Sequence, residues 1–201
     1  MRPPLAAPAL LAVLLLLAGC SAAPETRLAP TRPPAETATG PTLQGRSAAL
    51  QPVRSAVPPV RLVVESAGID IPVDPVGVRG DGEMEVPADI SRGGWYRYGA
   101  DPASATGSTV IAAHVDSFDA GIGPFAYLKT LTAGQQIQVT TSDGAEHRYA
   151  VETVVSVPRD QLPADDVFDR DGSPRLVLIT CGGQFGNGEY SDNVIVVAVP
   201  Q

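Results

Sequence analysis

Short apolar runs separated by turn-forming residues fill the chain from residue 61 onward. Runs of this length that alternate with polar positions, or stay apolar for four to eight residues, are typical of β-strands, and the intervening glycines and prolines are typical of turns. Two short helical patterns occur at residues 123–131 and 161–168. The predicted strands are 61–64, 69–71, 84–86, 109–114, 136–141, 146–157, 175–181 and 193–199.

Two of the predicted strands are apolar without interruption, at residues 176–179 and 194–197. A strand of this kind is covered by other parts of the protein on both faces. A domain with so many strands must also protect its sheet edges, and closure into a barrel removes them. The pattern therefore predicts a mostly β fold, a closed eight-stranded β-barrel with short helices.

The N-terminus has the pattern of a secretion signal. Arg2 is followed by an apolar run over residues 5–17, and small residues then lead to Cys20. The run is shorter than the roughly 20 residues that span a bilayer. Residues 17–20 (LAGC) resemble a bacterial lipobox, in which the cysteine is lipidated. We predict a signal peptide with a lipobox-like end at residues 1–20. The alternatives are an ordinary signal peptide cut near residues 21–23 and a short retained anchor.

Residues 21–60 are rich in Ala, Pro, Thr and Arg and show no apolar periodicity. Such a composition cannot bury enough apolar surface to offset the entropy of ordering, so it predicts a disordered tether. Residues 61–201 then form the folded domain, whose size suits a single core. We expect this domain on the extracellular face of the cell membrane, held by an N-terminal lipid or anchor.

Charge and motif content exclude several function classes. The formal net charge of -8 is uneven, because residues 1–60 carry five arginines against two glutamates, while residues 61–201 carry nine basic against twenty acidic residues. An acidic domain is repelled by phosphate backbones, so no nucleic-acid partner is expected. The chain has no glycine-rich phosphate loop and no zinc-spaced cysteine and histidine set, so we expect no cofactor and no metal. A monomer is the default expectation.

The two cysteines and two histidines are the candidates for chemistry. If Cys20 is lipidated or removed, Cys181 has no disulfide partner, and a free thiol in an exported domain suggests a reactive group; a small buried side chain is the alternative. Cys181 ends an apolar strand and precedes two glycines, which we expect to give room for a substrate backbone. His114 also ends an apolar strand, whereas His147 follows a turn and is expected to be solvated. Cys181 as nucleophile and His114 as acid/base partner is the predicted pair.

Four segments resemble the sortase domain, in particular the class F sortases of actinobacteria. They are residues 109–116 (TVIAAHVD), 124–131 (PFAYLKTL), 136–139 (QIQV) and 178–183 (LITCGG). The resemblance implies a closed eight-stranded barrel and a cysteine transpeptidase. Such an enzyme cleaves a C-terminal sorting signal of the Leu-Pro-x-Thr-Gly kind in secreted proteins, holds the product as a thioester, and passes it to an amine of a peptidoglycan precursor or another acceptor.

One position departs from the family pattern. Sortases use an arginine to bind the sorting signal and stabilise the oxyanion, and the class F pattern places it where this chain has Ser191. Ser191, Asn193 and the backbone around Gly182 are candidate replacement donors, and Arg92 and Arg97 are candidate substituting arginines. Loss of one oxyanion donor typically costs about 10²–10³ in rate.

Two other functions stay open from the sequence. Because Ser191 replaces the arginine, the chain could be a catalytically weak or inactive sortase-fold lipoprotein that binds sorting signals or wall peptides. A cysteine peptidase that only hydrolyses its substrate is the other alternative. Reactivity of Cys181 separates both enzymes from the binding protein, and transfer to an added amine separates the transpeptidase from the peptidase.

Overall fold

A computed structural model of the protein describes residues 55–201. The predicted signal peptide at residues 1–20, lipidation of Cys20 and nearly all of the predicted tether at residues 21–60 lie outside the described residues. The first strand begins at Pro59, so the folded domain starts close to the predicted boundary at residue 61.

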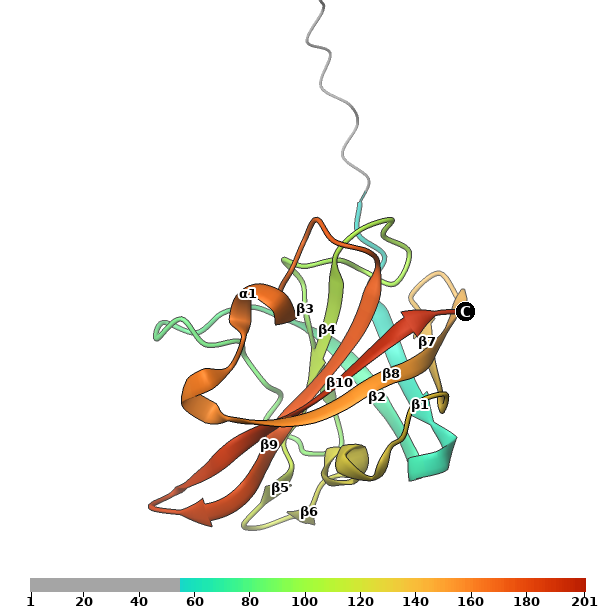
Figure 1. Cartoon of the computed structure of the whole chain (residues 1–201). Coiled ribbons are helices and arrows are strands. Elements are labelled where there is room, and N and C mark those ends of the chain that lie inside the picture. Colours follow the sequence, from blue (N-terminus) through green and yellow to red (C-terminus); the bar gives the residue numbers. More distant parts are fainter. Residues whose placement is uncertain (1–54) are drawn as a thin grey trace, which may run out of the picture. The chain divides into compact units, whose positions relative to one another are not determined.

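The described residues form a closed barrel of eight strands, as predicted (Figure 1). Its order is β1-β2-β3-β4-β9-β10-β8-β7, and pairing of β1 with β7 closes it. A separate two-stranded sheet consists of β5 (Asp116–Ser117) and β6 (Gly121–Ile122). The barrel strands are β1 (Pro59–Val64), β2 (Ile69–Val76), β3 (Gly93–Tyr96), β4 (Ser108–Ala112), β7 (Gln136–Thr141), β8 (Glu146–Pro158), β9 (Arg175–Gly186) and β10 (Glu189–Pro200).

The helices of the described part are short. The helix predicted at residues 123–131 is a 3₁₀-helix, η2 (Pro124–Thr130), and its Phe125 and Leu128 are fully buried in the barrel core. In place of the helix predicted at 161–168, a turn of 3₁₀-helix, η3 (Arg159–Gln161), is followed by one turn of α-helix, α1 (Ala164–Val167). A further 3₁₀ turn, η1 (Glu65–Ala67), connects β1 to β2.

The strand predicted at residues 84–86 is wrong. Met84 makes only an isolated bridge with Val78, inside the segment 77–92, which we call the β2–β3 loop. The third barrel strand is instead β3, which contains Gly93 and Gly94. A Cβ atom at Gly94 would lie 2.8 Å from Cδ of Pro87, so the β2–β3 loop packs directly on this strand. Glycine weakens the sequence pattern of a strand, although here it is needed for the close approach.

Two apolar layers lie on opposite faces of β4 and β9. Because side chains alternate along a strand, Ile111 and Leu178 point into the barrel core, while Val110 and Ile179 belong to a second cluster outside it. The outer cluster is covered by α1 and the β2–β3 loop, which contribute Val167, Met84 and Val86 among others. Burial on both faces is the physical reason for the uninterrupted apolar sequence of β9.

The pairing of β4 with β9 is parallel and well defined. Its register runs from Ser108 opposite Arg175 to Ala112 opposite Ile179. Just beyond, the Ala113 N–H donates to the Ile179 carbonyl at 3.3 Å, and the buried Thr180 hydroxyl donates to the Ala113 carbonyl at 2.8 Å. The contact therefore continues to the residues immediately before His114 and Cys181.

Substitution of Thr180→Val tests this contact. The change keeps the branched shape but removes the hydroxyl that binds the Ala113 carbonyl. We expect a loss of about 1 kcal/mol in the free energy of unfolding, the usual net value of one such hydrogen bond. Urea unfolding of the protein measures it, with Thr180→Ser as the variant that keeps the hydroxyl. Equal stability of Thr180→Val and the unsubstituted protein would contradict the assigned contact.

Candidate active site

Cys181 and His114 lie side by side at one end of the β4–β9 pair. One step past Ala113 and Thr180, the parallel register places His114 next to Cys181, on strands that are roughly 4.8 Å apart. Alternation from the outward-facing Ala112 and Ile179 turns both side chains out of the barrel. Both are half-buried, and both line one hollow of about 960 Å³. The structure thus brings the predicted pair together.

The hollow lies at the His114 and Cys181 end of β4 and β9, where Ala112 and Ile179 line it. Its apolar lining also includes Tyr96 and Phe168, whose rings meet edge to face with centroids 5.0 Å apart. The Asp169 carbonyl accepts the backbone N–H of Ser108, the first residue of β4. A hollow of about 960 Å³ is large enough for a peptide segment.

The surroundings of Cys181 favour the neutral thiol. Burial raises the pKa of the thiol above its ordinary value, and the carboxylates of Asp116 and Glu83 raise it further. The guanidinium of Arg159 acts in the opposite direction and lowers this pKa. The thiol of the resting protein is therefore neutral, whereas the form of a cysteine that attacks a carbonyl is the charged thiolate.

A hydrogen bond between two hairpins borders the site. The hydroxyl of Tyr190, on β10, donates to a carboxylate oxygen of Asp116, on β5. The bond to Asp116 is also the main cause of a raised pKa of Tyr190, with burial and the nearby Cys181 adding to it. Figure 1 shows the β9–β10 hairpin projecting past the barrel next to β5 and β6. The bond ties the residues that follow His114 to the strand that flanks Cys181.

The candidate donors on β10 occupy different surroundings. Asn193 pairs with Cys181 across β9 and β10 and lines the hollow. Ser191 falls at a register irregularity of the same pair and is exposed, and its hydroxyl oxygen accepts the backbone N–H of Gln184 at 3.0 Å. Ser191 therefore holds the β9–β10 hairpin, and it is not among the residues that line the hollow.

The two glycines after Cys181 fit against β10. A Cβ atom at Gly182 would lie 2.7 Å from Cγ2 of Val194. Gly183 has a left-handed backbone (φ +75°), and a Cβ there would lie 2.2 Å from Oγ of Ser191. The sequence suggested room for a substrate backbone, but in the structure the space next to these glycines is taken by the neighbouring strand.

The three arginines relevant to the site differ in position. Arg92 forms a bidentate ion pair with Asp74, with both contacts at 2.5 Å, and Arg97 lies over the ring of Tyr98. Neither lines the hollow. Arg159, which the sequence analysis did not single out, does line it. No motif marks Arg159; its only signal is that it lies two residues past the end of the long strand predicted at residues 146–157.

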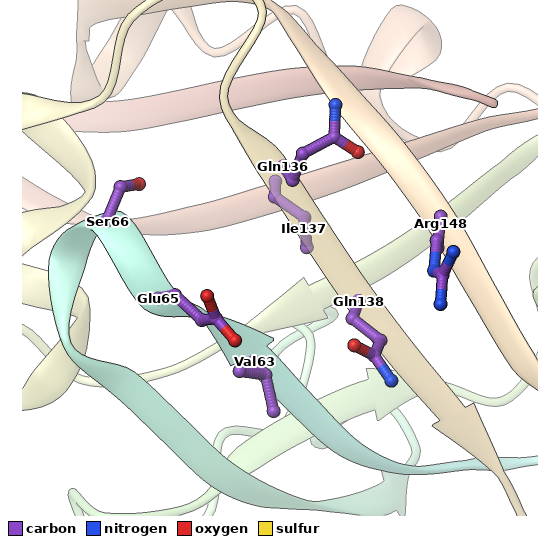
Figure 2. A pocket seen from close by; sticks show the side chains of 7 residues that line it. All are labelled: Val63, Glu65, Ser66, Gln136, Ile137, Gln138 and Arg148. Atoms are coloured by element: carbon purple, nitrogen blue, oxygen red, sulfur yellow. The ribbon is translucent and has the colours of Figure 1, made fainter.

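Other polar groups lie apart from the pair. His147, on β8, is opposite Val139 of β7 and is half-buried, with Nε2 buried and unpaired, contrary to the expected solvated side chain. A second hollow, of about 430 Å³, is lined by side chains that include Gln136, Gln138 and Arg148 (Figure 2). Its lining contains neither cysteine nor histidine, so it lacks the groups for acyl transfer.

Metal-ligating groups and membrane-spanning helices are both absent from residues 55–201. In this part of the chain, no group of three or more cysteine, histidine or acidic side chains could hold a metal ion. None of the helices found there has the length and apolar character needed to cross a membrane.

Comparisons with known proteins agree with this architecture. A search of curated proteins gave no match. Among solved structures, sortase C2 of the group B Streptococcus pilus island 1 is 21% identical, with a TM-score of 0.53 over 70% of this chain and 72% of the other. Sortase C-1 from Actinomyces oris is 21% identical, with a TM-score of 0.53 over 70% of this chain and 70% of the other. Sortase A of Listeria monocytogenes is 18% identical, with a TM-score of 0.52 over 73% of this chain and 88% of the other. At these identities the likeness concerns the fold.

A comparison with protein families matched the Sortase domain over residues 62–201. The match runs from within β1 to the end of β10 and includes both His114 and Cys181. The chain belongs to the sortase family.

Proposed function

We propose that this protein is a sortase-type cysteine transpeptidase in which Cys181 and His114 are the reacting pair. The observation that carries the proposal is their placement. His114 lies just past the end of β4 and Cys181 lies on the adjacent parallel strand β9; the two side chains face the same side and line one hollow large enough for a peptide. A thiol next to an imidazole in a peptide-sized cleft has the groups that acyl transfer requires.

The proposed reaction has two halves. His114 takes the proton of the Cys181 thiol as the sulfur attacks the scissile carbonyl carbon, and it delivers this proton to the amine that departs as the thioester forms. An acceptor amine then attacks the thioester, and the imidazole passes the proton that this amine loses to the departing sulfur, which regenerates the thiol. Division into two acyl transfers lowers each barrier, and one imidazole can serve in both directions.

The proposed substrate is a C-terminal sorting signal of the Leu-Pro-x-Thr-Gly kind in secreted proteins. Membership of the sortase family supports this substrate class, and the apolar lining by Tyr96, Phe168 and Ile179 suits the Leu and Pro side chains. The acceptor would be a peptidoglycan precursor or another protein amine. The class F type rests on the sequence resemblance at residues 109–116 and 178–183.

The proposed location is the extracellular face of the membrane. It rests on the secretion-signal pattern of residues 1–20 and the lipobox-like end at Cys20. A lipid at Cys20, joined to β1 by a segment rich in Pro, Ala and Thr, would let the domain reach sorting signals and wall precursors near the membrane. Transfer of secreted proteins to the wall requires an enzyme on this side of the membrane.

Peptide cleavage tests the proposed reaction. We expect the protein to cleave a fluorescence-quenched Leu-Pro-x-Thr-Gly peptide library and, with an added amine, to form an amine-linked product detectable by mass spectrometry. Cys181→Ala and His114→Ala should each lose activity by several orders of magnitude, because they remove the nucleophile and the proton carrier. Arg148→Ala changes a residue of the second hollow (Figure 2) and should cleave the peptide as well as the unsubstituted protein does.

Each alternative outcome has a distinct meaning. Cleavage without an amine-linked product would assign a hydrolase in place of the transpeptidase. Peptide binding by a folded protein that never turns the peptide over would assign the binding lipoprotein. Cleavage that survives Cys181→Ala would remove the proposed nucleophile.

The pH dependence of alkylation tests the environment of the thiol. Since burial and two carboxylates raise the pKa of Cys181, half-maximal reaction with iodoacetamide should occur above the roughly 8.5 of a free cysteine. At pH 7, the folded protein should react more slowly than the same chain in denaturant. A Cys20→Ala background excludes the other thiol, and Cys181→Ser supplies the blank. A midpoint at or below that of the denatured chain would contradict the described surroundings.

Fractionation of cells tests the tether. With Cys20 as the lipid-bearing residue, the protein should partition into detergent with membranes and incorporate labelled palmitate. Cys20→Ala should abolish the label and release the protein or leave it unprocessed. An unlabelled protein with unchanged membrane retention would favour a retained anchor, and secretion of an unlabelled product would favour an ordinary signal peptide.

A further inference from the structure

Arg159, the first residue of η3, lines the active-site hollow from the end of β8. It directly follows β8, whose last residue, Pro158, pairs with Asp192 of β10. On the other edge of β10, Asn193 pairs with Cys181. Strand β10 therefore separates the backbones of Arg159 and Cys181, and the long arginine side chain spans that width to line the same hollow. One register step past Pro158 places Arg159 opposite Ser191.

The other cations of the described chain are positioned differently. Besides Arg159, the hollow is lined by Arg79 and Arg170. Arg79 pairs with Asp81 at 3.0 Å and with Glu83 at 2.5 Å. Arg170 follows Asp169, which binds the start of β4, so it lies at the end of the hollow away from His114. Among residues 55–201, Arg159 is the cation whose charge acts on the Cys181 thiol.

Glu83 holds Arg159 only weakly. The nearest atoms, Nη2 of Arg159 and Oε1 of Glu83, are 3.5 Å apart, and the two side chains are 42% and 56% exposed. The other oxygen of Glu83 is already bound to Arg79. An exposed, long ion pair of this kind adds little to stability. Arg159 can therefore exchange Glu83 for a new acceptor at little cost.

We propose that Arg159 is the group that binds the scissile carbonyl oxygen next to Cys181, and that Glu83 holds it in place in the free protein. This inference rests on the proposed function. As the Cys181 sulfur bonds to the carbonyl carbon, the C=O π electrons move to oxygen, and the guanidinium N–H groups donate to that oxyanion. When the electrons return, the C–N bond breaks and the amine leaves with the proton from His114.

A guanidinium suits this role physically. It stays charged at every relevant pH and offers several donors, so it can bind an oxyanion without losing a proton. Hydrogen bonds to charged acceptors are roughly twice as strong as neutral ones. Arg159 also opposes the carboxylates of Glu83 and Asp116, which raise the pKa of the thiol. The other titratable groups near the thiol are His114, which lines the same hollow, and Tyr190. The same side chain thus favours both the thiolate and the oxyanion.

Steady-state cleavage of the peptide by substituted full-length proteins tests the role. Arg159→Ala should lower kcat/KM by about 10²–10³, the usual effect of losing one oxyanion donor, mainly through kcat. Arg159→Lys should recover part of the loss, because it keeps the charge without the planar donor pair. Arg97→Ala, which removes an arginine outside the hollow, should stay within about twofold of the unsubstituted protein.

Alkylation of Cys181 supplies a readout that needs no turnover. In a Cys20→Ala background, Arg159→Ala should move the pH midpoint of iodoacetamide reaction upward, because a cation is lost. Glu83→Gln should move it downward, because an anion is lost. Thermal unfolding of each variant identifies any that fail to fold, and Arg159→Lys then serves in place of Arg159→Ala.

The outcomes separate the two proposals. If the unsubstituted protein cleaves the peptide and Arg159→Ala does so equally well, the role of Arg159 is overturned while the transpeptidase stands. If the unsubstituted protein does not cleave, the proposed function fails, and opposite midpoint shifts in the two variants would still support placement of Arg159 at Cys181. Absence of those shifts would overturn that placement.

Discussion

The parallel pairing of β4 with β9, covered by apolar side chains on both faces, is the constraint on which the site depends. The inner face packs in the barrel core through Ile111 and Leu178, and the outer face packs under α1 and the β2–β3 loop. A one-residue slip would exchange the two faces and expose apolar side chains, so the register is strongly fixed. Because His114 and Cys181 follow this pair directly, the packing that fixes the register also fixes their spacing.

The sequence contains part of this constraint, which is why the barrel could be predicted and why His114 and Cys181 could be placed at the ends of apolar strands. Of these two strands, the one before Cys181 was predicted to be covered on both faces, because residues 176–179 are apolar without interruption. The strand β3 was missed because Gly93 and Gly94 carry no pattern, and their need for close packing is visible only in three dimensions. Arg159 was missed for a related reason: its position at the hollow depends on the β8–β10 register, which no local motif encodes.

The charges around Cys181 create a balance that suits a thiol enzyme at rest. Burial together with Glu83 and Asp116 disfavours the thiolate, while Arg159 favours it. A thiol that stays neutral until a substrate arrives is less open to oxidation, because oxidation proceeds through the thiolate. A peptide that fills the hollow and displaces Glu83 from Arg159 would shift this balance toward the thiolate. Substrate binding and activation of the nucleophile would then be coupled through one weak ion pair.

The β9–β10 hairpin explains why β10 supplies no cation to the hollow. At position 191 a serine accepts the Gln184 N–H and packs against the left-handed Gly183, where a Cβ atom would already lie 2.2 Å from its oxygen. An arginine at this position would lose that hydrogen bond, and its longer side chain would have to leave the crowded turn. Ser191 thus serves the hairpin and leaves the hollow without a cation from β10. Strand β8 flanks β10 on the side away from Cys181, so the residue that follows β8 is placed to reach across it.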